Sequence, residues 1–349
     1  MFWDSLKAPF SILAPMEGVT DIVFRQVVAK AGRPSVFFTE FTNVCSYASE
    51  AGRPNATQRL EFLPEEQPIV AQIWGKTPAD FALTANGLKE LGYQAVDINT
   101  GCPDKNVIRQ GCGAALIKDP KLTAEIIQAT KSSGLETSVK CRLGYSKLEE
   151  YKTWIPHLLS QDIKALTVHL RTKKEMSKVP AHFELIPELV RMRNDIAPQT
   201  KLIINGDIPD VATGYQLIAQ HNPAGKSSAG LDGIMIGRGV FQNPFCFTDH
   251  QPTQADLLDL LHYHLNLWEA HANTHGEHCG VNRPVGKVGC QRPVVLRDMG
   301  DLREPSFEPL KRFFKIYIHG VRGASDLRAK LMETKNITQV RAILKEEGL

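Results

Sequence analysis

Short apolar runs alternate with longer amphipathic stretches over most of this chain. Each apolar run is rich in β-branched residues and ends in glycine or polar residues, as buried strands do. Eight runs have this pattern, at 11–16, 36–41, 68–75, 95–101, 138–144, 165–172, 201–207 and 233–239. Stretches of helical periodicity lie between them, among them 78–92, 121–134 and 211–221. Strands that alternate with helices predict parallel pairing through right-handed crossovers.

Eight such units predict an α/β fold of the (β/α)₈ TIM-barrel type. An open doubly wound sheet is the competing architecture, and it should carry a G-x-G-x-x-G motif after its first strand. The segment that follows the first run here is "APMEGVTD", which lacks that motif. Polar residues instead follow almost every strand, which is where a TIM barrel places its active site.

The alternating pattern stops near residue 250. Three helical stretches follow, at 253–276, 307–320 and 323–348. Glycines and prolines mark 277–305 as a connecting loop or insertion. We therefore predict a catalytic barrel domain over 1–250 and a small all-helical domain over 251–349.

Composition narrows the class of protein. The 349 residues contain no apolar run long enough for a membrane span, and the first residues do not resemble a signal peptide. Seven scattered cysteines show no paired framework, so we expect reduced thiols in a soluble cytoplasmic protein. The net charge is only +3, but residues 281–349 hold fourteen lysines and arginines against eight acidic residues. This end of the chain could therefore face an anionic partner.

Two glycine-containing turns follow the last two predicted strands. The seventh strand ends in Asn205, Gly206 and Asp207, and the eighth leads into Gly237 and Arg238. Either turn alone could be an ordinary tight turn. In a barrel, however, the loops after strands seven and eight form the usual phosphate site, so together they predict a phosphorylated cofactor.

Cationic side chains recur on two neighbouring strands. Lys140 alternates with Arg142 on one strand, and His169 with Arg171 on the next, so each pair shares a face. Buried cations are costly unless they meet an anion or ligand, although salt bridges could account for some of them. Gln72 is a polar residue in an apolar strand, placed either for a cofactor ring or as a satisfied core amide.

Cys102 follows the fourth strand, three residues after Asn99. A buried inert thiol is the ordinary role of a free cysteine. Its place at the predicted catalytic rim favours a working thiol instead, either a nucleophile or a proton donor. The residues alone leave that choice open.

A metal site is a weaker hypothesis. Candidate ligands gather at His271, His275, His278, Cys279 and Cys290. Zinc sites usually bring a C-x-x-C pair or an H-E-x-x-H motif, and neither is present. We predict no metal.

Several of these segments together resemble the flavin-dependent tRNA-dihydrouridine synthases. The motifs are "APMEGVTD", "NTGCP" with "GCGAALIKDP", "VKCRLG", "VHLRT", "NGD" and "IGRG…NP", in that family's order. The segment "LKRFFKIYIHGVRGASDLRAKL" is similar to the family's helical RNA-binding domain. The resemblance covers nearly the whole chain.

The resemblance implies an FMN in the barrel mouth and NADPH or NADH as its reductant. It implies ten cofactor-binding residues: Pro15, Met16, Gln72, Lys140, His169, Asn205, Gly206, Asp207, Gly237 and Arg238. It also implies hydride transfer to carbon 6 of a uridine in the tRNA D-loop, with Cys102 as the proton donor to carbon 5. The implied substrate-binding residues are Asn99, Arg142, His169 and Arg171. The target uridine must leave the stacked bases of the tRNA to reach the flavin. The basic helical domain would hold the rest of the tRNA. The enzyme is expected to be a monomer.

Three other functions fit parts of the sequence. Another FMN-barrel oxidoreductase, resembling dihydroorotate dehydrogenase or an ene-reductase, shares the flavin and phosphate features but leaves the basic helical region unexplained. A non-catalytic RNA-binding protein leaves Cys102, Lys140 and His169 unexplained. A phosphate-binding aldolase-type barrel could use Lys140 as a Schiff-base lysine.

Overall fold

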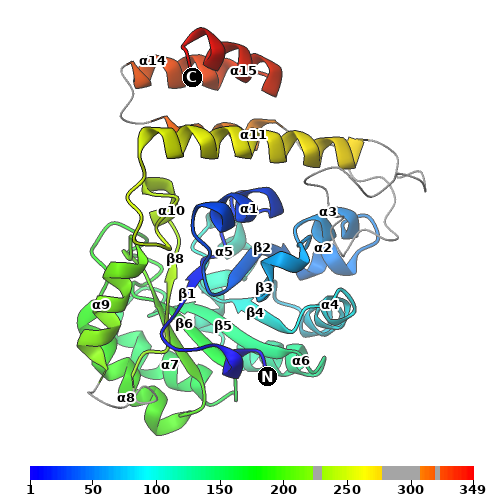
Figure 1. The fold of residues 1–349 in the computed structure, drawn as a ribbon. Coiled ribbons are helices and arrows are strands. Elements are labelled where there is room, and N and C mark those ends of the chain that lie inside the picture. The colour runs from blue at the N-terminus through cyan, green and yellow to red at the C-terminus, as the bar shows by residue number, and fades with distance from the viewer. Residues whose placement is uncertain (223–229, 277–306, 319–322) are drawn as a thin grey trace.

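The computed structural model describes residues 1–222, 230–276, 307–318 and 323–349 (Figure 1). All eight predicted strands are present and parallel. They are β1 (Phe10–Leu13), β2 (Phe37–Asn43), β3 (Ile69–Trp74), β4 (Ala95–Asn99), β5 (Glu136–Arg142), β6 (Ala165–His169), β7 (Lys201–Asn205) and β8 (Gly233–Ile236). Their order in the sheet is β1-β8-β7-β6-β5-β4-β3-β2.

A single bridge closes this sheet into a barrel. Ile12 of β1 pairs with Val36, just before β2. The amide of Leu13 donates to the Val36 carbonyl, and the Val36 amide donates to the Ser11 carbonyl, both at 3.1 Å. The predicted (β/α)₈ barrel is therefore confirmed.

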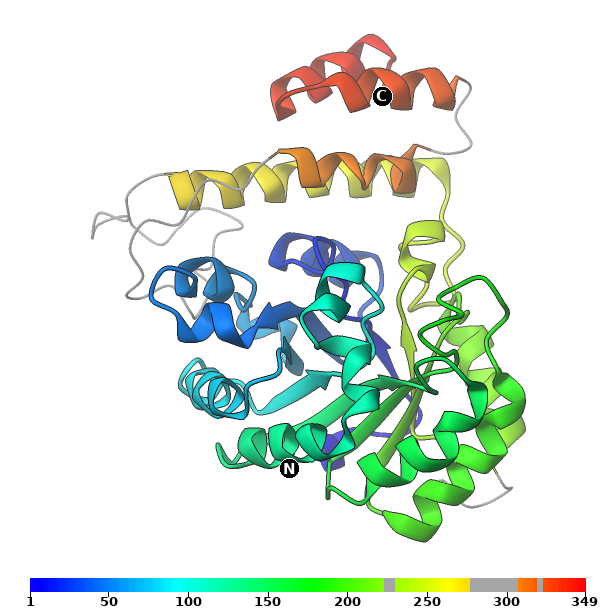
Figure 2. The same cartoon turned by 180° about the vertical axis from the view of Figure 1, so that it is seen from behind.

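Helices cover the outside of the barrel, as Figures 1 and 2 show. They are α1 (Ile22–Ala31), α2 (Val44–Ala48), α3 (Arg53–Gln58), α4 (Pro78–Glu90), α5 (Lys105–Arg109), α6 (Pro120–Lys131), α7 (Tyr151–Leu159), α8 (Ile186–Ile196), α9 (Val211–His221) and α10 (Gly239–Gln242). The helices predicted over 78–92, 121–134 and 211–221 are α4, α6 and α9.

The barrel interior has an apolar end and a polar end. Inward-facing residues near the strand starts, such as Val70, Ala95 and Ile203, pack with Phe10 and with Trp3 of the N-terminal segment. Farther along the same strands, the inward positions hold polar residues. We call the end of the barrel where the strands finish the mouth, and strand alternation brings the side chains of different strands together there.

A helical region follows the barrel. It consists of α11 (Gln254–Gly276), α12 (Glu308–Lys311), α13 (Phe314–Tyr317), α14 (Ala324–Glu333) and α15 (Ile337–Glu346). The helix predicted over 307–320 is wrong as one element, because a turn at 312–313 separates α12 from α13. The predicted 323–348 stretch is two helices, and Asn336 caps the second. The predicted 277–305 loop lies outside the described residues.

The helical region packs directly on the barrel helices. In Figure 1 α11 lies beside α1, and α14 and α15 lie beyond it. The Phe313 ring stacks on Phe24 of α1 with centroids 4.4 Å apart, and on Phe241 of α10 at 6.3 Å. Leucines of α11 belong to the same hydrophobic cluster as the outward side chains of the strands. The expected division at residue 250 stays a prediction.

Candidate active site

A cavity of about 490 Å³ opens at the mouth of the barrel. Ten of the sixteen residues that line it were predicted as site residues: Pro15, Met16, Lys140, Arg142, His169, Asn205, Gly206, Asp207, Gly237 and Arg238. The others are Ala14, Ser177, Ile208, Pro209, Gly239 and Gln242. Gln72, Asn99, Cys102 and Arg171 do not line it. Gln242 could have been expected, because it follows Gly239 by three residues and so lies one helical turn away.

The turns after β7 and β8 form one wall of this cavity. Gly206 has φ +112° and Asp207 has φ +52°, so the chain turns sharply after β7. A side chain at Gly206 would lie 3.4 Å from His169 Cε1, and a non-glycine residue would also be strained there. Asn205 donates to the Met235 carbonyl at 2.8 Å, which ties the end of β7 to β8 just before the second turn.

Two basic side chains of the cavity, Lys140 and His169, form no salt bridge among the described residues, whereas Arg238 pairs with Asp207 at 3.4 Å. Among the described residues, the Lys140 ammonium makes no hydrogen bond or salt bridge. Burial, reinforced by the nearby Arg142, lowers the pKa of Lys140 to about 8. Burial also lowers the pKa of His169 well below its usual value, and the surrounding cations add to this effect. His169 is therefore neutral at pH 7, and its buried Nδ1 has no hydrogen-bond partner in the part of the chain that the structure describes.

Arg142 is held in place by backbone carbonyls. Its Nε donates to Gly101 at 2.8 Å, and its Nη1 donates to Thr172 and Met176 at 3.1 Å. Burial lowers its pKa to about 10, so it stays charged near neutral pH. The guanidinium thus joins the loop that carries Cys102 to the loop that follows β6.

Cys102 lies on a tight turn beside this cavity. The Asn99 side-chain oxygen accepts from the Gly101 and Cys102 amides, at 3.1 and 2.9 Å. Gly113 packs against the turn so closely that an added Cβ would lie 2.8 Å from the Cys102 carbonyl oxygen. Burial raises the pKa of the half-buried Cys102 thiol, and Lys140 and Arg142 only partly oppose this effect. The thiol is therefore protonated at neutral pH.

Beneath Asn99 lies a buried acidic residue that the sequence interpretation missed. Gln72 is fully buried, donates to Asp97 at 2.7 Å and accepts from Asn99 at 2.9 Å. Burial raises the pKa of Asp97 to about 6, against hydrogen bonds from Ser138 and Gln72 and the charge of Lys140. A signal was available, since Asp97 interrupts an apolar strand at a position with the same inward parity as Asn99.

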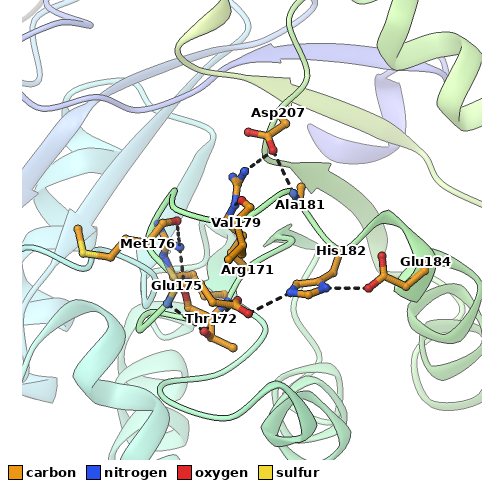
Figure 3. A network of polar contacts seen from close by, with 10 residues as sticks. Arg171, Thr172, Glu175, Met176, Val179, Ala181, His182, Glu184 and Asp207 are labelled. Carbon is orange, nitrogen blue, oxygen red and sulfur yellow. Dashed lines mark hydrogen bonds and ion pairs between the residues drawn. The ribbon is translucent and has the colours of Figure 1, made fainter.

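Arg171 does not line the cavity but contacts Asp207, which does (Figure 3). Because β6 ends at His169, the alternation that would place both side chains on one face stops there. Arg171 donates to the Val179 carbonyl at 2.6 Å and forms a salt bridge with Asp207. Its Nη1 is buried and has no hydrogen-bond partner within the described ranges. Asp207 also accepts from the Ala181 amide at 3.0 Å, so Arg171 and Asp207 secure the loop after β6.

The same loop is tied further along by acidic residues. Glu175 accepts from Thr172 and contacts His182 at 3.1 Å, and Glu184 contacts the other ring nitrogen at 2.7 Å (Figure 3). Burial opposes protonation of His182, but these two carboxylates still raise its pKa. The loop that covers this side of the mouth is therefore well anchored.

Two expectations concern metals and membranes. Over the described ranges, no group of three or more potential ligands could hold a metal ion. His278 and Cys279, like Cys290 and the side chain of His275, lie outside what the structure describes, and the His271 ring is 3.8 Å from Glu61. No helix in the described part of the chain is long and apolar enough to cross a membrane.

The chain is similar to known proteins along nearly its whole length. The family model described as "Dihydrouridine synthase (Dus)" matches residues 12–288. A "Probable tRNA-dihydrouridine synthase 2" of Bacillus subtilis (strain 168) is 48% identical over 98% of this chain and 95% of that protein. A "Probable tRNA-dihydrouridine synthase" of Staphylococcus aureus (strain COL) is 47% identical over 99% and 95%. Among solved structures, a 2-naphthoyl-CoA reductase has a TM-score of 0.49 at 10% identity, over 67% of this chain and 48% of that one, which is too weak to bear on function. This chain belongs to the dihydrouridine synthase family.

Proposed function

We propose that this protein is a tRNA-dihydrouridine synthase, which reduces the C5=C6 double bond of uridines in the tRNA D-loop to 5,6-dihydrouridine. FMN would be its cofactor and NADPH or NADH its reductant. The observation that carries the proposal is the 48% identity to the Bacillus subtilis relative over nearly the full length of both proteins. The mouth of the barrel adds a cavity of suitable size, lined in part by Lys140, which forms no salt bridge among the described residues.

The cavity residues suit a flavin phosphate. The turns of Gly206 and Gly237, with Arg238, would hold the phosphate end, while Pro15 and Met16 would pack on the ring system. The remaining candidates near the ring or its chain are Gln72, Lys140, His169, Asn205 and Asp207. Two observations support this fit, namely that the Nδ1 of His169 and the Lys140 ammonium both lack a partner among the described residues. A bound anion or ring oxygen would satisfy both.

When bound and reduced, the flavin supplies a hydride for carbon 6 of the uracil ring. Cys102 then gives its proton to carbon 5 and recovers one from solvent, so that two hydrogens are added across the double bond. Its raised pKa keeps the thiol in the protonated form that this role requires. Arg142 and His169 would bind the uracil carbonyls, and Arg171 would support them through Asp207. Asn99 uses one amide N–H for its bond to Gln72, and its second N–H would serve the same purpose.

The target uridine must leave the stacked RNA to enter the cavity, so the protein must hold the rest of the tRNA. The basic residues of the helical region, 251–349, would bind its phosphates. We further propose that the enzyme works as a monomer in the cytoplasm.

An in vitro assay tests this function directly. The purified protein, loaded with FMN, is incubated with NADPH and an unmodified tRNA transcript, and dihydrouridine is mapped by mass spectrometry. The expected result is dihydrouridine at D-loop positions and flavin absorbance in the protein. Flavin reduction without any dihydrouridine, but with turnover of a free small molecule, would point to another FMN-barrel oxidoreductase.

A further inference from the structure

A chain of four polar side chains runs across three neighbouring strands beneath the Cys102 turn. Ser138 donates to one carboxylate oxygen of Asp97 at 2.7 Å, and Gln72 donates to the other at 2.7 Å. Asn99 donates to the Gln72 carbonyl oxygen at 2.9 Å. The Asn99 oxygen then accepts from the backbone amide of Cys102 at 2.9 Å. Each link is a direct hydrogen bond, and the first three join buried groups, while the Cys102 amide at the end is partly buried.

The ionised carboxylate gives this chain a direction. A carboxylate only accepts hydrogen bonds, so Gln72 must turn its NH₂ toward Asp97 and its oxygen toward Asn99. Asn99 must then present its NH₂ to Gln72 and its oxygen to the Cys102 turn. If the side-chain amide of either residue were flipped, two oxygens or two N–H groups would face each other and the hydrogen bond would be lost. Asp97 thereby fixes the rotation of two amides and secures the acceptor that holds the turn.

Strand register explains why these residues meet. Gln72 is the direct neighbour of Asp97 across β3 and β4, and Asp97 is the neighbour of Ser138 across β4 and β5. One step farther along the same strands, Asn99 lies opposite Lys140. The chain therefore forms a polar layer immediately below the catalytic layer.

The carboxylate of Asp97 lies deep inside the barrel, where the free-energy cost of burying a charge calls for an explanation. Asp97 and Gln72 are both completely shielded from water. Burying a carboxylate costs free energy, and apolar residues of similar volume often serve a core equally well. The ammonium of Lys140 attracts the Asp97 carboxylate. The layer thus connects to the proposed proton donor Cys102 through hydrogen bonds and to the cavity-lining Lys140 through charge.

We propose that Asp97 is a positioning residue of this enzyme, which acts through Gln72 and Asn99 to hold the Cys102 turn and through its charge to hold Lys140 at the mouth. This inference rests on the proposed function for the role of Cys102, but the arrangement of the turn can be tested without it. Asp97 touches neither substrate nor cofactor in this scheme.

The test measures the reactivity of the Cys102 thiol in the full-length protein. Asp97→Asn removes the charge at nearly constant shape, and Gln72→Met breaks the link to Asn99 while the charge stays. Alkylation by iodoacetamide is followed at Cys102 by peptide mass spectrometry between pH 6 and 10, with the exposed Cys45 as the internal reference. Asp195→Asn, which changes an exposed aspartate on α8, is the matched control.

We expect both variants to loosen the turn and raise the alkylation rate of Cys102 at pH 8 by about threefold or more, with Cys45 unchanged. Asp97→Asn should in addition shift the pH dependence of the Cys102 alkylation rate. In the tRNA assay both should lower kcat by roughly tenfold or more with little change in KM for tRNA, as loss of an orienting partner typically does.

Unchanged alkylation rates and pH profiles at Cys102 in both variants would overturn the proposal. If Asp97→Asn does not fold, Gln72→Met decides by the same measurement, because it interrupts the same chain. A parent protein that makes no dihydrouridine refutes the proposed function instead, since the alkylation measurement does not depend on turnover.

Discussion

Arg25 and Arg193 lie outside the strands, between the barrel and its helices, whereas Lys140 and His169 lie inside the mouth. Arg25 pairs with Glu66 at 2.7 Å and donates to two backbone carbonyls. Arg193 pairs with Asp232 at 2.7 Å and likewise donates to carbonyls. The outer arginines are thus neutralised within the protein, while the described residues of the mouth offer Lys140 and His169 no salt bridge.

The difference separates two uses of a buried cation. A paired arginine links segments that are distant in the chain, and its removal leaves a buried carboxylate unmatched. An unpaired cation weakens the fold, and it makes sense where a ligand later supplies the negative charge. Burial lowers the pKa of Lys140 to about 8, and it lowers the pKa of His169 so far below its usual value that the imidazole is neutral at pH 7. The predictions below probe this division between mouth and outer layer.

The largest effect is expected from Cys102→Ala in the mouth. Loss of the proton donor should lower dihydrouridine formation by about 10²–10⁴-fold, while the flavin absorbance and the unfolding free energy stay close to those of the parent. Cys45→Ala, which changes an exposed thiol, is the matched control and should keep full activity. Normal activity of Cys102→Ala would show that another group delivers the proton.

In the outer layer, Arg25→Met should act on stability. We expect it to lower the free energy of unfolding by about 3–5 kcal/mol, because Glu66 and two carbonyls lose their buried partner. Denaturant titration measures the loss. Arg191→Met removes an exposed guanidinium that pairs with Glu188 and should cost less than about 1 kcal/mol. Similar losses for both variants would contradict the structural role of Arg25.

The stability of the Asp97→Asn variant relative to the parent protein should increase as pH rises. The pKa of Asp97 is raised to about 6, so its protonated form favours the fold below about pH 4, and this contribution is lost as pH rises through 6. Asparagine does not titrate. The stability of the variant relative to the parent should therefore increase between pH 4 and 7 by up to about 3 kcal/mol.

Thermal unfolding at a series of pH values follows this difference. Asp195→Asn should show no such trend, because that side chain is exposed. A constant difference between Asp97→Asn and the parent across this range would mean that Asp97 is not the destabilised acid described above.

The smallest effect is expected for an exposed lysine, which belongs neither to the mouth nor to the paired arginines of the outer layer. Lys335, between α14 and α15, should contact tRNA phosphate if the helical region holds the RNA. Lys335→Ala should weaken binding modestly and reduce the slope of log Kd against log salt by about one. Filter binding at several salt concentrations measures this slope. Lys7→Ala, near the opposite end of the barrel, should leave the slope unchanged, and equal slopes for both variants would remove Lys335 from the interface.

Sequence patterns predicted the barrel and half of the cavity wall, and the family resemblance added Pro15 and Met16. Strand alternation and the turns of Gly206 and Gly237 are local features, so single segments reveal them. Lys140 and His169 could be predicted because the barrel topology brings all strand ends together.

Features that depend on distant partners could not be predicted in the same way. The partners of Asp97 lie 25 and 41 residues away, and only the strand register shows that Gln72 and Ser138 meet it. Arg171 contacts Asp207 and does not line the cavity, because β6 ends two residues before it. The break between α12 and α13 places Phe313 on the ring of Phe24, a contact that helical periodicity does not encode.

That ring contact also bears on how the protein can be divided. A gene cut after residue 250 would yield a barrel whose Phe24 and Phe241 rings face solvent, since Phe313 covers them in the intact chain. Such a fragment should aggregate unless polar substitutions replace the two rings. Chimaeras that exchange helical regions between homologues will therefore need to carry α1 and α10 along with the transplanted part.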